Sequence, residues 1–236
     1  MTKYLEDISD YWDTRARGYS LDNQAELESG QATKWLQLIE RYVSIKKEWH
    51  VLDLGCGPGF FSILLSQIGC RVTAIDYSDK MLQEAKANAE KYKTSIDFKK
   101  MDAHQLMFQD QSFDLIITRN VTWNLEQPMI AYQEMLRVLK PSGHLLNYDG
   151  NYYYHYTDED YNRKMHREHQ HMEGIDVSKI DGIAEHLELS KHLRPYWDEE
   201  VFKQLGVSSI EWDILNKEIN SLGKTMIRSF LIHVIK

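Results

Sequence analysis

Apolar residues in the middle of the chain follow two patterns that alternate along the sequence. The first is a short, nearly continuous apolar run, which predicts a strand buried on both faces of a sheet. The clearest run of this kind is 113–118, and further strands are predicted over 51–54, 71–76, 96–101 and 144–148. Helices are expected between these strands, except that a loop joins 96–101 to 113–118.

The second pattern places apolar residues three or four positions apart, which predicts amphipathic helices. One helix is expected over 60–68, another begins after Ser78 or Asp79, and a third covers 128–139 before a turn at 140–143. Strands and helices that alternate at this spacing predict a doubly wound, mostly parallel α/β sheet.

The flanking regions add elements to this sheet. Helical spacing predicts further helices over 3–17, 31–47 and 198–205. A loop around Gly18 would follow the first of these. Strand patterns at 207–214 and 226–235 are joined by a short link, which favours an antiparallel hairpin at the end of the sheet. We therefore expect seven strands in a single domain over 1–236, in which 1–30 is an N-terminal segment that precedes the sheet.

Residues 150–196 interrupt the alternation and are interpreted as an insertion. The segment begins with a run of tyrosines around His155 and holds six of the ten histidines. Aromatic groups with polar tips suit a pocket wall, so the insertion is expected to be a lid over a small substrate. Packing of the same tyrosines onto the sheet is the alternative interpretation.

Composition excludes several classes of protein. The 236 residues carry a net charge of −8, which argues against a partner with a phosphate backbone such as nucleic acid. The first residues lack the apolar core of a signal peptide, and no apolar stretch approaches the length of a membrane span, so we expect a cytoplasmic protein without a membrane partner. Cys56 and Cys70 fit neither a disulfide framework nor a zinc site, and Cys56 is interpreted as a small residue that fills a turn.

The glycines after the first strand indicate a ligand site. Gly55, Gly57 and Gly59 are spaced two apart between a strand and a helix start, where backbone N–H groups can approach a nucleoside-bearing ligand. The nicotinamide fingerprint requires a further glycine at position 60, which is Phe60, so a dinucleotide is disfavoured.

Polar residues at the other strand ends extend this site, because open α/β sheets bind ligands at the carboxyl ends of their strands. Asp76 ends the second strand 21 residues after Gly55, a separation at which an acid accepts hydrogen bonds from ribose hydroxyls. The third strand ends at Asp102, and the fourth ends at Arg119 and Asn120.

These motifs together resemble those of class I S-adenosylmethionine-dependent methyltransferases over residues 50–149. The resemblance is carried by 51–59, by Asp76 with the following helix, by Asp102 with Ala103, by 113–116 and by 136–143. It implies a Rossmann-like methyltransferase fold with an antiparallel C-terminal hairpin and an inserted lid, and S-adenosylmethionine as the cofactor.

The resemblance also implies roles for individual residues. Asp53 would orient the glycine loop and the cofactor ammonium group, Asp102 would bind the adenine amino group, Ala103 would donate its N–H to the ring, and Met81 would pack on the adenine. A core position for Met81 and a turn role for Asp102 are the alternatives. The predicted cofactor-binding residues are Tyr11, Tyr19, Asp53, Gly55, Cys56, Gly57, Gly59, Asp76, Tyr77, Met81, Asp102, Ala103, Arg119 and Asn120.

Methyl transfer from a sulfonium is an in-line displacement, so the protein mainly aligns the acceptor and excludes water. The catalytic candidates are His155, Asn120 and Trp123, with Asn124 and Asp149 as further groups that could orient or deprotonate an acceptor. The resemblance leaves open whether oxygen, nitrogen or sulfur is methylated. No metal is expected, because a helix would place His166 and His169 on one face but His171 off it.

Two other functions remain compatible with these motifs. The same pocket could serve the transfer of another group, such as aminopropyl, or the chain could be a non-catalytic binding or regulatory module. The three hypotheses differ in their products, which are S-adenosylhomocysteine, methylthioadenosine and neither of these.

Overall fold

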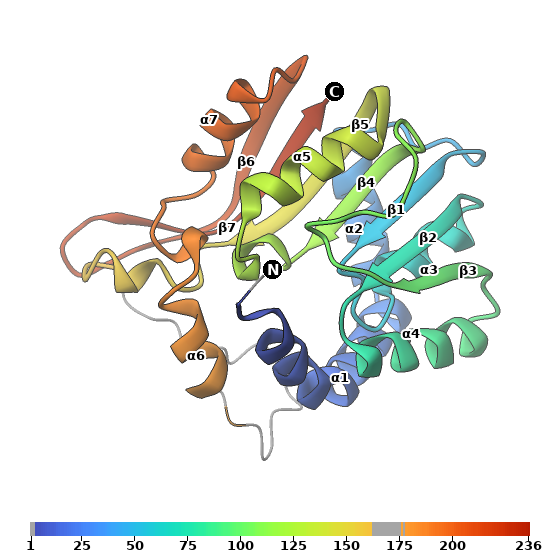
Figure 1. The fold of residues 1–236 in the computed structure, drawn as a ribbon, viewed down its shortest axis with the longest axis horizontal. Helices are drawn as coiled ribbons and strands as arrows, with labels where there is room; N and C mark the ends of the chain where they lie inside the picture. The colour runs from blue at the N-terminus through green and yellow to red at the C-terminus, as the bar shows by residue number, and fades with distance from the viewer. Residues whose placement is uncertain (1–2, 162–175, 177) are drawn as a thin grey trace.

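The computed structural model describes residues 3–161, 176 and 178–236. Seven strands form one sheet in the order β3-β2-β1-β4-β5-β7-β6 (Figure 1). The strands are β1 (His50–Leu54), β2 (Arg71–Asp76), β3 (Ile96–Lys100), β4 (Phe113–Arg119), β5 (Leu139–Gly150), β6 (Ser209–Ile219) and β7 (Thr225–Ile235). The first five strands pair in parallel, and β7 pairs antiparallel with both β5 and β6. The predicted fold class is confirmed.

Helices lie on both faces of this sheet. The α-helices are α1 (Leu5–Glu28), α2 (Gln31–Glu40), α3 (Phe60–Gln67), α4 (Asp79–Lys91), α5 (Pro128–Val138), α6 (Ser178–Ala184) and α7 (Tyr196–Gln204). Short 3₁₀ turns are η1 (Thr122–Asn124), η2 (Tyr154–Tyr156) and η3 (Glu188–Ser190). Side chains alternate along each strand, so Val51 packs toward α2 and α3 while Leu52 and Leu54 pack toward α5 and α7. Burial on both faces explains the apolar character of β1 and β4, whereas the edge strand β3 is only partly buried and carries Asp97, Lys99 and Lys100.

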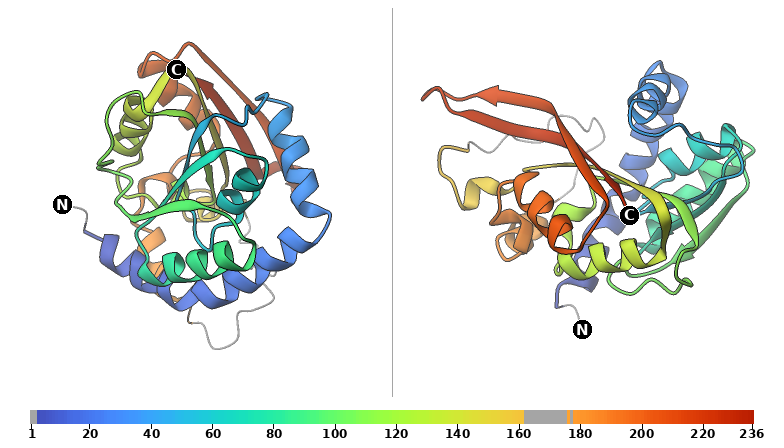
Figure 2. Two further views of the ribbon diagram at one scale, coloured as in Figure 1. Left: turned by 90° about the vertical axis from the view of Figure 1, so that its right-hand side faces the viewer. Right: turned by 90° about the horizontal axis from the view of Figure 1, so that it is seen from above.

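The N-terminal helix is longer than the sequence pattern predicts. α1 continues through Gly18 to Glu28, so the loop expected around Gly18 is wrong. A glycine inside a helix costs about 0.5–1 kcal/mol, but α1 lies along α4 on both sides of this position (Figure 2). Asp13 accepts a hydrogen bond from the backbone of Lys80 at 3.1 Å, and Gln24 donates to Asn88 at 2.8 Å. These contacts offset the cost and hold the helix straight.

Three other boundaries differ from the prediction. α2 ends at Glu40 instead of residue 47, because the chain needs the following residues to turn into β1, with Trp49 N donating to Lys46 O. The segment 140–143 is an irregularity within β5, where the register with β4 shifts between Phe113 and Leu115. The hairpin strands reach residues 219 and 225, which leaves a loop of only 220–224. In Figure 2 this hairpin extends beyond the rest of the sheet.

Within the described ranges, no helix has the length and apolar character that crossing a bilayer requires.

Candidate active site

A cavity of about 810 Å³ lies at the carboxyl edge of the parallel strands, beneath α1. Most of the predicted site residues line it, namely Tyr11, Tyr19, Asp53, Gly55, Cys56, Gly57, Asp76, Tyr77, Met81, Asp102, Ala103, Arg119, Asn120 and Trp123. Gly59 instead precedes α3 with a φ of 91°, and His155 lies on η2. The lining described for the cavity includes neither of them.

The glycine loop is held in place by the end of β2. Gly55 and Gly57 have φ of 67° and 51°, in the left-handed region that a residue with Cβ seldom adopts. Asp76 accepts from the backbone N–H of Gly57 at 2.9 Å through one oxygen and from that of Ser78 at 2.9 Å through the other. Burial raises the pKa of Asp76, although these backbone hydrogen bonds act in the opposite direction. Asp76 therefore fixes the loop and also faces the cavity.

Asp53 is a buried carboxyl group behind the glycine loop, with only 2% of its surface exposed. Burial raises the pKa of Asp53 to about 7, and a hydrogen bond from Ser62 on α3 only partly counters this. The nearby Asp76 raises the pKa further, while Arg119 lowers it. Asp53 therefore changes charge near neutral pH.

This pKa predicts a pH-dependent stability that Asp53→Asn removes. Because the folded state holds the Asp53 proton more tightly than the unfolded chain does, its contribution is full below about pH 4 and is lost as pH rises to about 7. We expect wild type to lose up to about 4 kcal/mol relative to the variant across this window. Urea unfolding of the ligand-free proteins from pH 4 to pH 8 measures this difference. A difference that stays constant with pH would contradict the prediction.

At the end of β3, Asp102 is partly engaged by a neighbouring histidine. Its Oδ1 accepts from the backbone of His104 at 2.9 Å and lies 2.6 Å from His104 Nδ1. Burial tends to raise the pKa of Asp102, but the hydrogen bonds from His104 outweigh it and lower the pKa. Met81 on α4 is buried at 3% exposure and still lines the cavity. The two interpretations of Met81, core residue and pocket residue, are thus compatible.

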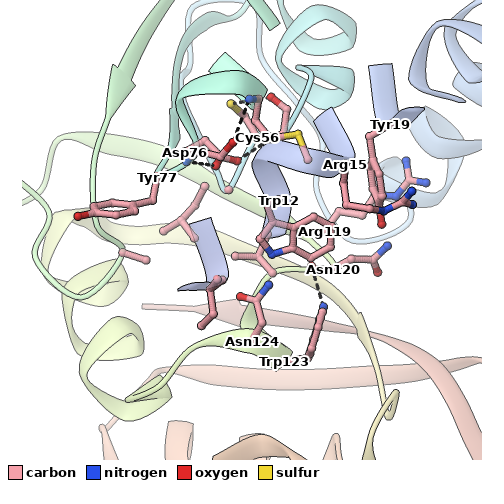
Figure 3. A pocket seen from close by; sticks show the side chains of 18 of the residues that line it. Trp12, Arg15, Tyr19, Cys56, Asp76, Tyr77, Arg119, Asn120, Trp123 and Asn124 are labelled. Carbon is pink, nitrogen blue, oxygen red and sulfur yellow. Dashed lines mark hydrogen bonds between the residues drawn. The ribbon is translucent and has the colours of Figure 1, made fainter. Parts of the chain in front are cut away.

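α1 contributes a wall with two charged groups that the sequence analysis missed. Arg15 is buried at 2% exposure with its guanidinium 5.0 Å from the ring of Tyr19. Glu26 forms a bidentate ion pair with Arg119 at 2.8 and 2.9 Å. Figure 3 shows Arg15 and Tyr19 across the cavity from Asp76 and Tyr77. One face of α1 lines the cavity, and its residues recur every three or four positions, at 8, 11, 15, 19, 22 and 26. A helix predicted to continue through Gly18 would have placed these residues on one face.

The opposite wall is an aromatic cluster between α1, η1 and the insertion. Trp123 lies between Trp12 and Tyr153, with ring centroids 6.3 and 5.2 Å apart respectively, and 5.7 Å from Tyr152. Ile180 of α6 is buried in the same cluster. The ring centroid of His155 lies 5.9 Å from that of Tyr153. Tyr153 lines the cavity. The insertion therefore meets α1 over the cavity, and the two interpretations of its tyrosines both apply.

The loop after β4 carries two asparagines that line the cavity. Asn120 has a φ of 58°, and its Oδ1 accepts from the Tyr152 hydroxyl at 2.6 Å. Its backbone oxygen accepts from Trp123 Nε1 at 3.0 Å (Figure 3). With its amide oxygen and nitrogen exchanged, Asn124 accepts from Trp12 Nε1 at 3.0 Å and donates to the oxygen of Val121 at 2.8 Å. This loop is thus tied both to α1 and to the insertion.

Asp149 was predicted as a group that could orient the methyl acceptor, but in the structure it stabilises the fold. It is fully buried, accepts from Arg194 Nη1 at 2.8 Å and from the backbone of Trp123 at 2.8 Å. The Asp149 carboxylate therefore makes its hydrogen bonds within the protein. Asp149 is not among the residues described as lining the cavity.

Neither cysteine is activated for chemistry. Cys56 and Cys70 are free and buried, and burial raises the pKa of both thiols. Among the described residues, no group of three or more histidine, cysteine, aspartate or glutamate side chains could hold a metal. His166, His169 and His171 lie outside the described residues.

Comparison with known proteins identifies the central part of the chain. Residues 52–147 match the model of a family described as a methyltransferase domain. A demethylmenaquinone methyltransferase of Paenarthrobacter aurescens is 33% identical over 146 residues, covering 62% of this chain and 56% of the relative. A ubiquinone biosynthesis O-methyltransferase of Coxiella burnetii is 32% identical over 110 residues, covering 47% of each chain.

A solved structure extends the likeness in fold to nearly the whole chain. A SAM-dependent methyltransferase from Aquifex aeolicus superimposes with a TM-score of 0.61 at 18% identity, covering 93% of this chain and 96% of that one. At this identity the likeness concerns the fold alone. The chain spans about half of the length of the curated relatives it matches.

Proposed function

We propose that the chain is a class I S-adenosylmethionine-dependent methyltransferase, and that it transfers the cofactor's methyl group to a small-molecule acceptor. The observation that carries the proposal is the cavity at the carboxyl edge, because the glycine loop and three strand ends line one part of it and an aromatic wall lines the other. In open α/β sheets, this edge is where a nucleoside cofactor binds.

The residues present fit S-adenosylmethionine, which supplies an electrophilic methyl group when it is bound. In the proposed arrangement Asp76 accepts hydrogen bonds from the ribose, and the free oxygen of Asp102 accepts from the adenine amino group while Ala103 donates to the ring. Asp53 and the glycine loop face the amino-acid end. Tyr11 and Tyr19 of α1 close over the ligand, which is the proposed role of residues 1–30. The protein then excludes water and aligns the acceptor with the methyl carbon.

Asp76→Ala is expected to raise the dissociation constant of S-adenosylmethionine. Loss of charge-assisted hydrogen bonds to the ribose weakens binding by about 1–3 kcal/mol, which corresponds to roughly 5- to 150-fold. Calorimetry measures the change. Asp79→Ala is the matched control, because Asp79 lies three positions further on, is exposed and pairs with Lys100. Equal affinity of the folded Asp76 variant and wild type would contradict the assignment of Asp76.

The insertion, residues 150–196, is proposed as a lid that restricts the acceptor to a small molecule. Ile180 is 2% exposed and packs with Ile8, Tyr11 and Trp123, so α6 is docked on α1 by apolar contact. A closed lid excludes water from the transfer step, whereas a bulky acceptor requires this face to be open.

Ile180→Asp is expected to undock the lid by placing an unpaired charge in this cluster. Turnover should fall by about 10-fold or more, with little change in the thermal unfolding of the sheet, because α6 can separate without disturbing the strands. Ile219→Asp is the control, since Ile219 is 72% exposed at the hairpin loop. Wild-type turnover in the Ile180 variant would refute the lid.

Untargeted mass spectrometry of cell extracts incubated with S-adenosylmethionine tests the proposed function. An acceptor that gains a methyl group, with formation of S-adenosylhomocysteine, supports methyl transfer. Methylthioadenosine would instead indicate transfer of an aminopropyl group, and neither product would indicate a binding module. The proposed location is the cytoplasm, on the sequence grounds given above.

A further inference from the structure

Asn120 is held in a backbone conformation that is unfavourable for its residue type. Its φ of 58° lies in the left-handed region, where an asparagine is better tolerated than most other residues with Cβ but is still uncommon. Such conformations persist where the surroundings over-determine them, and they concentrate at functional sites. The backbone N–H of Asn120 donates to Tyr148 O at 2.9 Å and its oxygen accepts from Trp123 Nε1 at 3.0 Å. Both backbone groups are therefore held.

The side chain of Asn120 is held at one end by the insertion. Tyr152 donates its hydroxyl to Asn120 Oδ1 at 2.6 Å. Burial raises the pKa of Tyr152 well above its ordinary value, so the hydroxyl keeps the proton that it donates in this bond. An asparagine amide is planar with oxygen and nitrogen on opposite sides, so this bond decides which end faces the rest of the cavity.

The amide nitrogen is the polar group of Asn120 that remains for a ligand. Among the described residues, no acceptor is bonded to this nitrogen, whereas the other three polar groups of Asn120 all have partners. Asn120 lines the cavity, and it does so beside Val121, which packs on Gly55 of the glycine loop. The nitrogen is therefore placed between the cofactor loop and the lid.

We propose that Tyr152 is a positioning residue that fixes the Asn120 amide with its nitrogen toward the cavity, where it donates a hydrogen bond to an oxygen of the acceptor. Asn120 then acts as a hydrogen-bond donor and not as a proton acceptor. The acceptor class is a small molecule that carries an oxygen with free lone pairs beside the atom to be methylated. This inference rests on the proposed methyl transfer.

Two substitutions separate the donor role from a structural role. Asn120→Asp keeps an oxygen for the Tyr152 hydroxyl but replaces the donor with a second oxygen, so turnover of the acceptor identified in extracts should fall by about 100-fold. Tyr152→Phe keeps the ring in the aromatic wall but releases the amide, so kcat should fall by about 10-fold. The affinity for S-adenosylmethionine is measured separately from turnover. In Tyr152→Phe it should remain within about two-fold, because Tyr152 is not among the predicted cofactor-binding residues.

Tyr42→Phe is the matched control, since the Tyr42 hydroxyl donates to Asp213 in a similar bond between the turn after α2 and β6. We expect wild-type kinetics from this variant. The double variant Tyr152→Phe, Asn120→Asp should be no slower than Asn120→Asp alone, because the two residues act through one hydrogen-bonded unit. Wild-type turnover in Asn120→Asp would overturn the donor role, and additive losses in the double variant would overturn the positioning role of Tyr152.

A neutron crystal structure, in which deuterium atoms distinguish the amide nitrogen from the oxygen, supplies a readout that needs no acceptor. Wild-type protein should show the Asn120 oxygen on the Tyr152 hydroxyl, and Tyr152→Phe should show a rotated amide. An amide nitrogen on Tyr152 in wild type would overturn the proposal whether or not an acceptor is found. Failure of wild type to methylate any extract component, with this orientation confirmed, would count against the proposed methyl transfer and leave the orientation established.

Discussion

Arg194→Met is expected to lower the free energy of unfolding by about 3–5 kcal/mol, because it leaves two buried carboxylates without a counter-charge. Arg194 is fully buried at the end of the insertion, where its guanidinium pairs with Asp149 at 2.8 Å and with Asp198 at 2.7 Å. It also donates to Thr122 Oγ1 at 2.7 Å and to the Tyr132 hydroxyl at 3.1 Å. This network joins the insertion to β5, α5 and η1.

Denaturant unfolding of wild type and variant at neutral pH measures this loss. Lys203→Met is the control, because Lys203 forms exposed ion pairs on α7 and its removal should cost less than about 1 kcal/mol. Adding Asp149→Asn and Asp198→Asn to the Arg194 variant should restore part of the stability, since it removes the unpaired charges. A loss in the Arg194 variant no larger than that in the Lys203 variant would refute this account of the network.

Gly55→Ala is expected to weaken S-adenosylmethionine binding by at least about 100-fold, through strain and a clash that act together. The φ of Gly55 is 67°, and a Cβ at this position would lie 2.4 Å from Val121 Cγ2 and 2.7 Å from Cγ1. Either the glycine loop or the loop after β4 must move, and both line the cavity. Calorimetric titration with S-adenosylmethionine measures the loss.

Two further variants separate strain from clash. Gly206→Ala introduces a Cβ at a φ of 75° with no atom within 4 Å, between α7 and β6, so it should affect stability alone. Val121→Ala in the Gly55→Ala background removes both methyl groups that cause the clash and should recover part of the affinity. Wild-type affinity in Gly55→Ala would show that the glycine loop does not require its observed conformation.

The sheet and its carboxyl edge could be predicted because both follow from local patterns. A continuously apolar run such as 113–118 can only be buried on both faces, and the polar residue that follows it must lie at the strand end. Asp76 and Asn120 were therefore placed at one edge before any contact was known. Gly55 and Gly57 were equally recognisable, since turns with positive φ select glycine.

The length of α1 could not be predicted in the same way. Gly18 is unfavourable in a helix, and the contacts that compensate for it come from Ser78, Lys80 and Asn88, which are about seventy residues away. Glu26, which lies beyond the predicted end of the helix, was missed for this reason. A residue's local propensity is worth about 1 kcal/mol, so a few long-range hydrogen bonds are enough to override it.

By itself, the sequence determined the order of strands and helices, the glycine loop and the acids at the strand ends, because each depends on the period of neighbouring residues. Only the tertiary structure decided that α1 and α6 meet over the cavity, that Asp149 is neutralised by Arg194, and that Tyr152 holds Asn120. These arrangements join segments more than 30 residues apart, and no local periodicity encodes which distant partner satisfies a buried polar group.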